Sequence, residues 1–388
     1  MEIADMVRNI VILGATGSIG TSAINVIRRH RKYFNIIGIA ANTSVERLAQ
    51  IANEFQVENV GVGNALALEG RRQFFRPGTK FFFGETGLNE MAMLPEAESM
   101  LVATVGLTGL LPTLTAIEQR KTILLASKEI LVVSGKFIIQ RAQEKNVQLL
   151  PVDSEHNAIF QCLRAGGSDS VDRLILTASG GPFRNFSQKD LASVTAAQAL
   201  QHPTWQMGKK ISIDSATMVN KGFEIMEARW LFDIPADRID VLIHPESIVH
   251  SMVQFCDGSV IAQMSLPNME IPLANCLFYP ERCHSSERTV NFAEQKILTF
   301  SAPDMKKFPA LSIALQCLNA KNGNACAVFQ AANEVAVGKF LAGKIGFSQI
   351  TEIISATLNS YGGEPMVSIE SCLNSAAMAR EVAETIAK

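Results

Sequence analysis

The stretch Asn9-Ile10-Val11-Ile12-Leu13-Gly14-Ala15-Thr16-Gly17-Ser18-Ile19-Gly20 decides the fold of this chain. Its first five residues are mostly apolar and predict a buried strand, and a helical pattern follows from Ser22 to Arg29. The three glycines let the backbone turn tightly and approach a pyrophosphate, whose charge a helix N-terminus favours. A plain glycine loop is the alternative, but the strand before it and the helix after it favour dinucleotide binding.

Apolar segments that alternate with amphipathic runs extend this pattern along the chain. The further predicted strands are Ile36 to Ala40, Val60 to Val62, Met100 to Thr104, Thr122 to Ala126 and Val147 to Leu150. The alternation predicts a parallel sheet, whose ligands bind beyond the carboxyl ends of the strands. Val105-Gly106 and Ser127-Lys128-Glu129 would then line the cofactor crevice. For Lys128 and Glu129, spacing alone favours a plainer interpretation, a solvated pair that opens a helix.

The end of the second strand indicates which cofactor is preferred. An NAD site usually has a carboxylate here to hold the ribose hydroxyls, and that carboxylate would repel a 2′-phosphate. Asn42, Thr43 and Ser44 stand there instead and favour NADP(H). The basic residue that often clamps the phosphate is missing, and Arg47 is the nearest. Asn42 could equally be an ordinary turn or helix-cap residue.

Two carboxylates follow the last of these strands, in Pro151-Val152-Asp153-Ser154-Glu155-His156-Asn157. Oxygen ligands placed so close suit a hard divalent ion, and Mg²⁺ usually takes only one or two protein carboxylates together with substrate oxygens. The alternative is an N-cap followed by an acidic first turn of a helix from Asn157 to Ala165. A third carboxylate, Glu224, favours the metal interpretation.

Two loops beyond residue 151 have the composition of ligand-binding segments. Thr177 to Phe183 offers hydroxyls and backbone N–H groups to an anion, although such loops are more often plain turns. Gln201 to Gly208 carries Trp205 among residues with poor helix propensity. That composition suits a mobile flap over a substrate, while packing is the commoner role for a Trp.

The segment Ile211 to Thr217 alternates polar and apolar residues and predicts a strand that leads into a helix. Lys221 and Glu224 are three residues apart on that helix and so share a face. They could be only a surface ion pair. In the functional interpretation Lys221 holds a phosphate, while Glu224 joins Asp153 and Glu155 at a cation.

Composition excludes several classes of protein. The chain has 388 residues, 47% hydrophobic and 19% charged, with a formal net charge of -2, so we expect a soluble globular protein without affinity for nucleic acid. Seven scattered Cys fit neither a disulfide framework nor a zinc site and are expected to be small buried residues of a reducing compartment. We see no signal peptide and no membrane span, and expect a cytoplasmic protein. His244 and His250 lack metal-binding spacing and are expected to be hydrogen-bonded structural residues.

The segments together predict an α/β protein in several parts. We expect an N-terminal Rossmann-like parallel-sheet dinucleotide domain, a central α+β catalytic and metal-binding domain with the flap, a linker and a C-terminal helical domain rich in Ala. The predicted bounds are 1–150, 151–280, 281–310 and 311–388.

Six motifs in register resemble the 1-deoxy-D-xylulose 5-phosphate reductoisomerase family, and Asn333-Glu334-Val335-Ala336 extends the resemblance toward the C-terminus. The motifs are Gly14–Gly20, Lys128–Glu129, Val152–Gln161, Ser179–Phe183, His202–Gly208 and Asp214–Gly222. The chain departs from the family's usual residues at Ala15, Ser127, Glu246, Asn268 and Glu270. None of these five is an expected metal or phosphate ligand.

The resemblance implies a role for each matching residue. The expected ligands of Mg²⁺ or Mn²⁺ are Asp153, Glu155 and Glu224. The phosphate end of the substrate would be held by Ser179, Ser215, Asn220 and Lys221. The rest of the substrate would be contacted by Lys128, Ser154 and His202, with Trp205 closing over it. NADPH would be contacted by Thr16, Gly17, Ser18, Ile19, Asn42, Ser127, Glu129 and Gly208.

The resemblance also implies an activity: NADPH-dependent rearrangement and reduction of a phosphorylated ketose, 1-deoxy-D-xylulose 5-phosphate, by a homodimeric enzyme with Lys128, Asp153, Glu155, His202 and Glu224 at the reacting centre. Rearrangement of an α-hydroxy ketone requires two oxygens to be held and polarised together, which suits a chelated divalent ion. Two alternatives are a metal-assisted NADP-dependent dehydrogenase without rearrangement and a nucleotide sensor without catalysis. The three carboxylates argue against the sensor.

Overall fold

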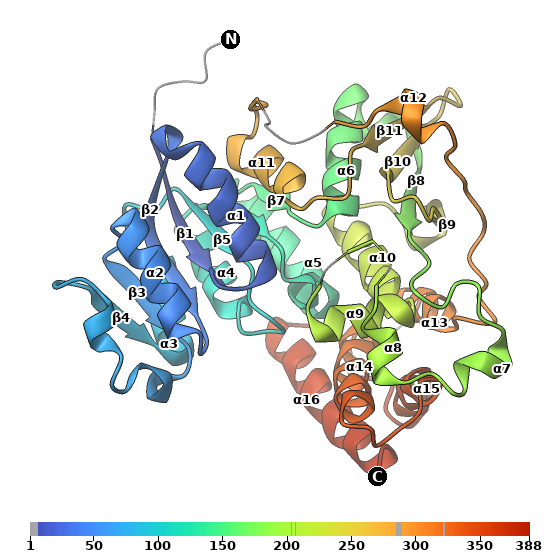
Figure 1. Ribbon diagram of the computed structural model, residues 1–388. Helices are drawn as coiled ribbons and strands as arrows, with labels where there is room; N and C mark the ends of the chain where they lie inside the picture. The colour runs from blue at the N-terminus through green and yellow to red at the C-terminus, as the bar shows by residue number, and fades with distance from the viewer. Residues whose placement is uncertain (1–6, 203, 206, 285–288, 321–322) are drawn as a thin grey trace. The chain divides into compact units, whose positions relative to one another are not determined.

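The computed structural model describes residues 7–202, 204–205, 207–284, 289–320 and 323–388 (Figure 1). The chain forms two compact units, each assembled from separate stretches of sequence. The first unit contains Met1–Ile130, Ile138–Asn157 and Asn268–Glu287. The second contains Leu131–Phe137, Ala158–Pro267 and Arg288–Lys388. The four-part division expected from the sequence stays a prediction.

The first unit is built on a seven-stranded parallel sheet in the order β4-β3-β2-β1-β5-β6-β7. Its strands are β1 (Arg8–Leu13), β2 (Phe34–Ala41), β3 (Asn59–Val62), β4 (Lys80–Phe83), β5 (Ser99–Val102), β6 (Thr122–Leu125) and β7 (Leu149–Pro151). Its helices are α1 (Ser18–Arg29), α2 (Val45–Phe55), α3 (Gly84–Ala92), α4 (Leu110–Glu118), α11 (Glu270–Phe278) and most of α5 (Lys128–Lys145). The predicted parallel sheet is confirmed, although β4 was not predicted.

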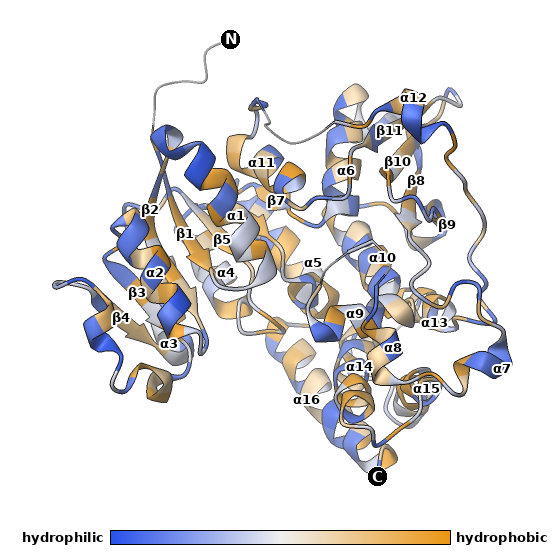
Figure 2. Ribbon diagram, in the orientation of Figure 1, coloured by the Kyte–Doolittle hydropathy of each residue, from blue (hydrophilic) through white to orange (hydrophobic). Residues whose placement is uncertain are grey.

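Strand β1 is at the centre of this sheet, and its burial explains its sequence. Ile10, Val11, Ile12 and Leu13 are all fully buried, as expected for a parallel strand covered on both faces. Figure 2 shows β1 and β5 in the hydrophobic colour. The strand order reverses between β1 and β5, the position at which open α/β sheets bind their ligands.

The second unit has a four-stranded mixed sheet in the order β11-β10-β8-β9, in which only β8 and β9 are parallel. Its strands are β8 (Val171–Ala178), β9 (Ile239–Ile243), β10 (Val249–Phe255) and β11 (Val260–Met264). Its helices are α7 (Gln188–Leu191), α8 (Ala196–Ala199), α9 (Lys209–Ala216), α10 (Val219–Leu231), α12 (Phe292–Gln295), α13 (Ala310–Leu318), α14 (Ala325–Leu341), α15 (Gln349–Ser360), α16 (Ile369–Ile386) and the end of α6 (Ser154–Cys162). The expected class, an α/β protein with a Rossmann-like sheet, a mixed-sheet region and a C-terminal helical region, is confirmed.

One predicted element of the second unit is wrong. The segment Ile211 to Thr217 was expected to be a strand, but its residues up to Ala216 belong to helix α9. The ion pair between Lys210 and Asp214 (Nζ to Oδ2, 2.8 Å) joins residues four apart, which is a helical spacing. The alternation of Ile and polar residues is too short to separate a strand from a helix.

The cysteines and histidines largely follow expectation. All seven Cys are free; five are buried, whereas Cys256 is exposed and Cys283 is partly exposed, contrary to the prediction. His244 accepts hydrogen bonds at Nε2 from the N–H groups of Ile248 and Val249, so its structural role is confirmed. None of the described helices combines the length and apolar character needed to cross a membrane.

Candidate active site

The glycine turn, residues 14–20, joins β1 to α1 as predicted. The N–H groups of Gly14 and Ala15 donate to the Ala40 carbonyl at the end of β2, which fixes the start of the turn. Gly17 is the N-cap of α1, and no side chain caps that helix end. Gly17 and Ser18 are exposed, while Thr16 and Ile19 are partly exposed. This helix start, which no side chain of the described residues caps, is the kind of position that favours an anion.

Gly14 is required by both conformation and space, and this gives a first prediction. Its φ is +90°, and a Cβ there would lie 2.3 Å from the carbonyl oxygen of Ala103, just after β5. We expect Gly14→Ala to destabilise the fold by more than the 1–3 kcal/mol or so that a strained backbone alone costs. Gly78→Ala is the control, since Gly78 has φ +89° with no atom near its added Cβ. Equal melting temperatures for the two variants would contradict a role for the close approach to Ala103.

The loop after β2 has the open character expected of a ribose site. Asn42, Thr43 and Ser44 are exposed, and Asn42 lies close to the backbone of the loop after β3, since a Cβ on Gly63 would be 2.7 Å from Asn42 Oδ1. The guanidinium of Arg47 extends toward α1, where it donates to Thr21 Oγ1 at 2.8 Å. The basic side chain nearest to Asn42 in the sequence thus lies beside the first turn of α1.

Ser127, Lys128 and Glu129 begin helix α5 just beyond β6. Ser127 is its N-cap and donates to the Thr104 carbonyl at 2.6 Å. Lys128 and Glu129 are 8% and 9% exposed, so the interpretation as a solvated pair is wrong. A buried lysine requires a partner, and Lys128 Nζ lies 2.6 Å from Asp153 Oδ2.

The carboxylate turn, residues 151–157, connects β7 to α6. Helix α6 begins at Ser154, earlier than expected, so Glu155 is in its first turn. The acidic-first-turn alternative therefore describes the local backbone correctly. A carboxylate oxygen of Asp153 nevertheless lies within 4.8 Å of one of Glu155, and both side chains are partly exposed.

The charge of Asp153 is set by its neighbours. Burial alone would raise the pKa of the Asp153 carboxyl, but the charges and hydrogen bonds of Lys128 and His156 outweigh burial and hold that pKa well below its usual range. His156 Nδ1 lies 3.3 Å from Asp153 Oδ2. Asp153 is therefore ionised at neutral pH. An ionised carboxylate with a second carboxylate oxygen nearby fits a hard divalent cation such as Mg²⁺.

In the second unit, the residues expected at the substrate phosphate come from three segments. Ser179 follows β8, Ser215 is on α9, and Asn220 and Lys221 are in the first turn of α10. The Ser179 loop (179–183) lies against the end of α9, since a Cβ on Gly181 would be 2.9 Å from the Ser215 carbonyl oxygen. Lys221 Nζ donates to the Thr177 carbonyl at 2.5 Å, which places Lys221 at the end of β8.

Lys221 and Glu224 form an ion pair on α10, as their spacing predicted. Both side chains are buried, at 4% and 0% exposure, so the surface-pair alternative is wrong. Asn220 Nδ2 also donates to Glu224 Oε1 at 2.5 Å. The pair therefore links the expected phosphate residues to the expected metal ligand of this unit.

His202 connects the expected flap to the Ser179 loop. Its Nδ1 accepts hydrogen bonds from the N–H groups of Thr204 (3.2 Å) and Trp205 (2.9 Å). The ring proton of a neutral imidazole is then on Nε2, which lies 3.0 Å from Ser179 Oγ and donates to it. The Trp205 indole packs against the His250 ring with centroids 6.3 Å apart. The flap itself stays a prediction, and its residues 203 and 206 lie outside the described part of the chain. Gly208, expected at the cofactor, is the N-cap of α9.

Asp214 and Asn333 are relevant residues whose contact the sequence did not reveal. Asn333 is fully buried in α14, and its Nδ2 donates to Asp214 Oδ1 at 2.8 Å. Asp214 precedes Ser215 and is 2% exposed. The C-terminal helical region thus holds the helix that carries Ser215. The Asn333–Ala336 motif marks Asn333 in the sequence, but nothing in the sequence indicates that its side chain contacts Asp214.

The departure at Glu270 now has a structural explanation. Glu270 starts α11, where Asn268 Oδ1 accepts a hydrogen bond from its N–H group (2.9 Å). Its carboxylate forms an ion pair with Arg29 and accepts from Asn25 Nδ2 at 3.1 Å, both on α1. The acidic residue at position 270 therefore pairs with a basic residue at the end of α1.

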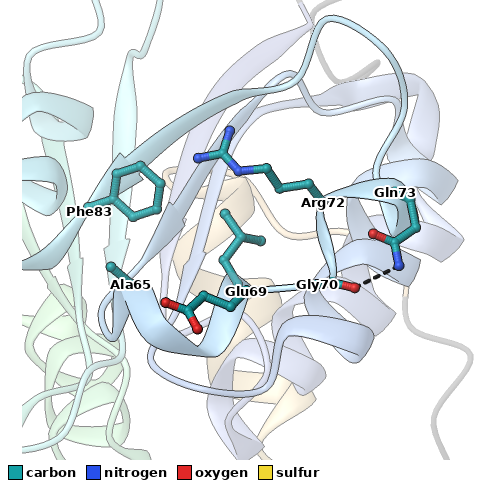
Figure 3. Close-up of a pocket in the computed structure, with 7 residues that line it drawn as sticks. Ala65, Glu69, Gly70, Arg72, Gln73 and Phe83 are labelled. Carbon is teal, nitrogen blue, oxygen red and sulfur yellow. Dashed lines mark hydrogen bonds between the residues drawn. The ribbon is translucent and has the colours of Figure 1, made fainter.

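A pocket of about 270 Å³ lies beside β4 in the first unit (Figure 3). Arg72 lies over the rings of Phe81 (5.0 Å) and Phe83 (5.9 Å) there, and Gln73 donates to the Gly70 carbonyl. The lining residues are Ala65, Leu68, Glu69, Gly70, Arg72, Gln73 and Phe83. None of them is an expected site residue, so the pocket adds nothing to the site.

The fold and these residues define a dinucleotide-dependent oxidoreductase. Family models described as 1-deoxy-D-xylulose 5-phosphate reductoisomerase, its C-terminal domain, and the DXP reductoisomerase C-terminal domain match residues 10–135, 149–232 and 264–382. The chain therefore belongs to the 1-deoxy-D-xylulose 5-phosphate reductoisomerase family.

Relatives that bear the same name cover nearly the whole chain. One from Bacillus thuringiensis is 43% identical over 381 residues, covering 98% of this chain and 99% of the relative. One from Chlorobium chlorochromatii is 45% identical over 381 residues, covering 97% and 99%. A solved structure of the Zymomonas mobilis reductoisomerase in complex with NADPH has a TM-score of 0.92 at 39% identity, covering 99% of this chain and 100% of that chain. A DOX-P reductoisomerase in complex with NADPH, fosmidomycin and magnesium has a TM-score of 0.93 at 37% identity, covering 98% of each chain.

Proposed function

We propose that this chain catalyses the NADPH-dependent and divalent-metal-dependent rearrangement and reduction of 1-deoxy-D-xylulose 5-phosphate to 2-C-methyl-D-erythritol 4-phosphate, a step toward isoprenoid precursors that does not use mevalonate. The observation that carries the proposal is the similarity to reductoisomerases over nearly the full length of both chains. The solved relatives described with NADPH and magnesium support the same cofactors here.

The proposed metal ligands are Asp153, Glu155 and Glu224, for Mg²⁺ or Mn²⁺. The donor set is all oxygen and anionic, which is what these hard ions prefer. The low pKa of Asp153 supports the assignment, because a ligand carboxylate must be deprotonated to bind. The proposed NADPH contacts are Thr16, Gly17, Ser18, Ile19, Asn42, Ser127, Glu129 and Gly208.

The proposed substrate residues have distinct tasks. Lys221, Asn220, Ser179 and Ser215 bind the phosphate and so fix one end of the molecule. Lys128 and Ser154 contact the reacting end, next to the carboxylates. His202 fixes the base of the flap through Thr204 and Trp205, and the Trp205 indole then covers the substrate and excludes water.

Each cofactor supplies chemistry that the side chains lack. When bound, the ion polarises and aligns the carbonyl and hydroxyl oxygens of the ketose, and NADPH supplies hydride for the reduction. The chain's own residues hold the substrate in one orientation between these two groups. Lys128 also keeps Asp153 ionised by pairing with it at 2.6 Å.

The decisive test follows NADPH oxidation by absorbance with 1-deoxy-D-xylulose 5-phosphate, with and without Mg²⁺. We expect oxidation only with the metal and a product with a rearranged carbon skeleton. Reduction without rearrangement would identify a dehydrogenase of another kind. Binding of NADPH without its consumption would identify a nucleotide sensor.

Cofactor choice gives a second prediction. We expect NADPH to be preferred over NADH in kcat/KM, because no carboxylate stands at the end of β2 to repel a 2′-phosphate. Asn42→Asp should lower the NADPH to NADH ratio by about tenfold or more, as expected when a contact to a charged group worth roughly 1.5–3 kcal/mol is lost. Asn35→Asp is the control, since Asn35 is an exposed Asn near the other end of the same strand. Equal efficiency of the parent chain with both cofactors would show that this loop does not read the 2′-phosphate.

We also propose a cytoplasmic homodimer, as the family resemblance implies. Light scattering of the purified chain tests the assembly, with a mass of twice 42.2 kDa expected. Fractionation of cells that produce the protein tests the location.

A further inference from the structure

The carboxylate turn is closed by the side chain of Asn157, a residue with no role in the proposed chemistry. Asn157 is 1% exposed, and its Nδ2 donates to the Pro151 carbonyl at 3.0 Å. Its backbone N–H donates to the Asp153 carbonyl at 2.8 Å. The first bond joins the two ends of the segment 151–157, and the second joins Asn157 to Asp153 within it, so Asp153 and Glu155 are presented from a closed loop of backbone.

Helix α11 completes this closure with two buried residues. Asn275 Oδ1 lies 3.2 Å from Asn157 Nδ2 and accepts from it. The Cys276 thiol donates to the same Pro151 carbonyl at 3.2 Å, and its sulfur lies 3.3 Å from Asn157 Nδ2. Burial raises the pKa of the Cys276 thiol, so it stays protonated and remains a donor at neutral pH. Strand β7 is at an edge of the described sheet, and these side chains hold its last residue.

Helix α11 is in turn anchored to the start of the first unit. Arg8 Nη1 donates to the carbonyls of Leu277 (2.8 Å) and Tyr279 (3.0 Å). The Phe278 ring is 1% exposed and packs edge-on against Phe34 with centroids 5.0 Å apart. With the pair between Glu270 and Arg29 at its other end, the helix is fixed at both ends. It therefore offers Asn157 a rigid support.

We propose that Asn157 is a positioning residue which, supported by Asn275 and Cys276 of α11, holds the Pro151 carbonyl and so sets the geometry in which Asp153 and Glu155 receive the divalent ion. This inference rests on the proposed metal site. Residues that orient metal ligands typically change metal affinity or activity by about 10- to 100-fold when they are replaced. A residue that only stabilises the fold would lower the melting temperature and leave metal affinity unchanged.

The test measures Mn²⁺ binding directly, from the loss of the free-ion EPR signal as full-length protein with NADPH is titrated with Mn²⁺. We expect Asn157→Ala to weaken Mn²⁺ binding by about tenfold or more, with an unchanged dissociation constant for NADPH. Asn324→Ala is the matched control. Asn324 is also a fully buried Asn, whose Nδ2 donates to Ser371 O and Ser375 Oγ in the C-terminal helical region. That variant should lose melting temperature and keep Mn²⁺ affinity.

A second pair of variants covers the case in which Asn157→Ala fails to fold. Cys276→Ser keeps a donor toward the Pro151 carbonyl, and Cys276→Ala removes it. We expect the Ala variant to bind Mn²⁺ more weakly than the Ser variant. Equal Mn²⁺ affinity in the parent and in the Asn157 and Cys276 variants would overturn the positioning role while leaving the metal site intact. Failure of the parent chain to bind Mn²⁺ would contradict the metal site itself, and the inference with it.

Discussion

Glu155→Gln is expected to lower turnover by about a thousandfold and to leave NADPH affinity nearly unchanged. The substitution keeps the shape of the side chain and removes one negative charge beside Asp153, whose carboxylate oxygen lies within 4.8 Å. A bound divalent ion contributes several kcal/mol to stabilising charge in the transition state. At 1.36 kcal/mol for each factor of ten, a loss of about 4 kcal/mol corresponds to about a thousandfold.

The measurement is steady-state NADPH oxidation at saturating substrate over a range of Mn²⁺ and Mg²⁺ concentrations. Excess metal should partly restore the rate of the variant, because a weakened site fills at higher concentration. Glu144→Gln is the control: Glu144 is an exposed carboxylate of the same unit, paired with Arg141 on α5. Turnover of the parent chain that survives complete chelation would contradict the metal assignment.

The features that could be predicted from the sequence are those encoded over a few neighbouring residues. The glycine turn was predictable because a strand, three glycines and a helix follow one another within residues 9–29. The pairing of Lys221 with Glu224 was predictable because helical spacing places them on one face. The two carboxylates at positions 153 and 155 were predictable as a pair because only one residue separates them in the sequence.

The features that could not be predicted depend on contacts between distant residues. A strand is expected where helix α9 lies because Ile211 to Asp214 alternates apolar and polar residues over four positions. The contact from Asn333 to Asp214, which holds that helix, joins residues 119 apart. Asn157 looked like an ordinary helix residue, because its partner Asn275 is 118 residues away. The burial of Lys128 could not be predicted either, because the carboxylate that compensates its charge belongs to Asp153, 25 residues later.

The assignment of most substrate contacts came from resemblance to a family, and the structure explains part of it. Ser179, Ser215 and Lys221 come from three segments that the second unit brings together through Thr177, Gly181 and α10. No spacing rule joins Ser179 to Ser215. Their roles toward the substrate are therefore best tested one at a time, beginning with the only lysine among them.

Lys221→Ala is expected to lower kcat/KM at saturating NADPH by about ten- to a hundredfold, because a hydrogen bond to a charged group contributes roughly 1.5–3 kcal/mol. Lys221 and Asn220 lie in the first turn of α10, where helix-start N–H groups also favour an anion. Its ammonium is buried and already bonded to Thr177 O and Glu224, so removing it also leaves the Glu224 carboxylate without a buried partner. Some loss of stability is expected for this reason.

A matched variant separates that loss of stability from a loss of substrate binding. Lys121 is also a lysine with 4% exposure, and its ammonium donates to the Leu94 carbonyl in the first unit. Lys121→Ala should therefore lower the melting temperature and leave kcat/KM close to that of the parent. A comparable fall in kcat/KM for both variants would attribute the effect of Lys221→Ala to folding.

A substrate analogue that lacks the phosphate decides where Lys221 acts. If the ammonium binds the phosphate, the analogue should be a poor substrate for the parent chain and should lose little more with Lys221→Ala, because the contact is already absent. The two changes would then be strongly non-additive, as expected for groups that interact directly. An equal further loss with the analogue would instead place Lys221 at the reacting carbons, where its ion pair with Glu224 would connect it to the metal rather than to the phosphate.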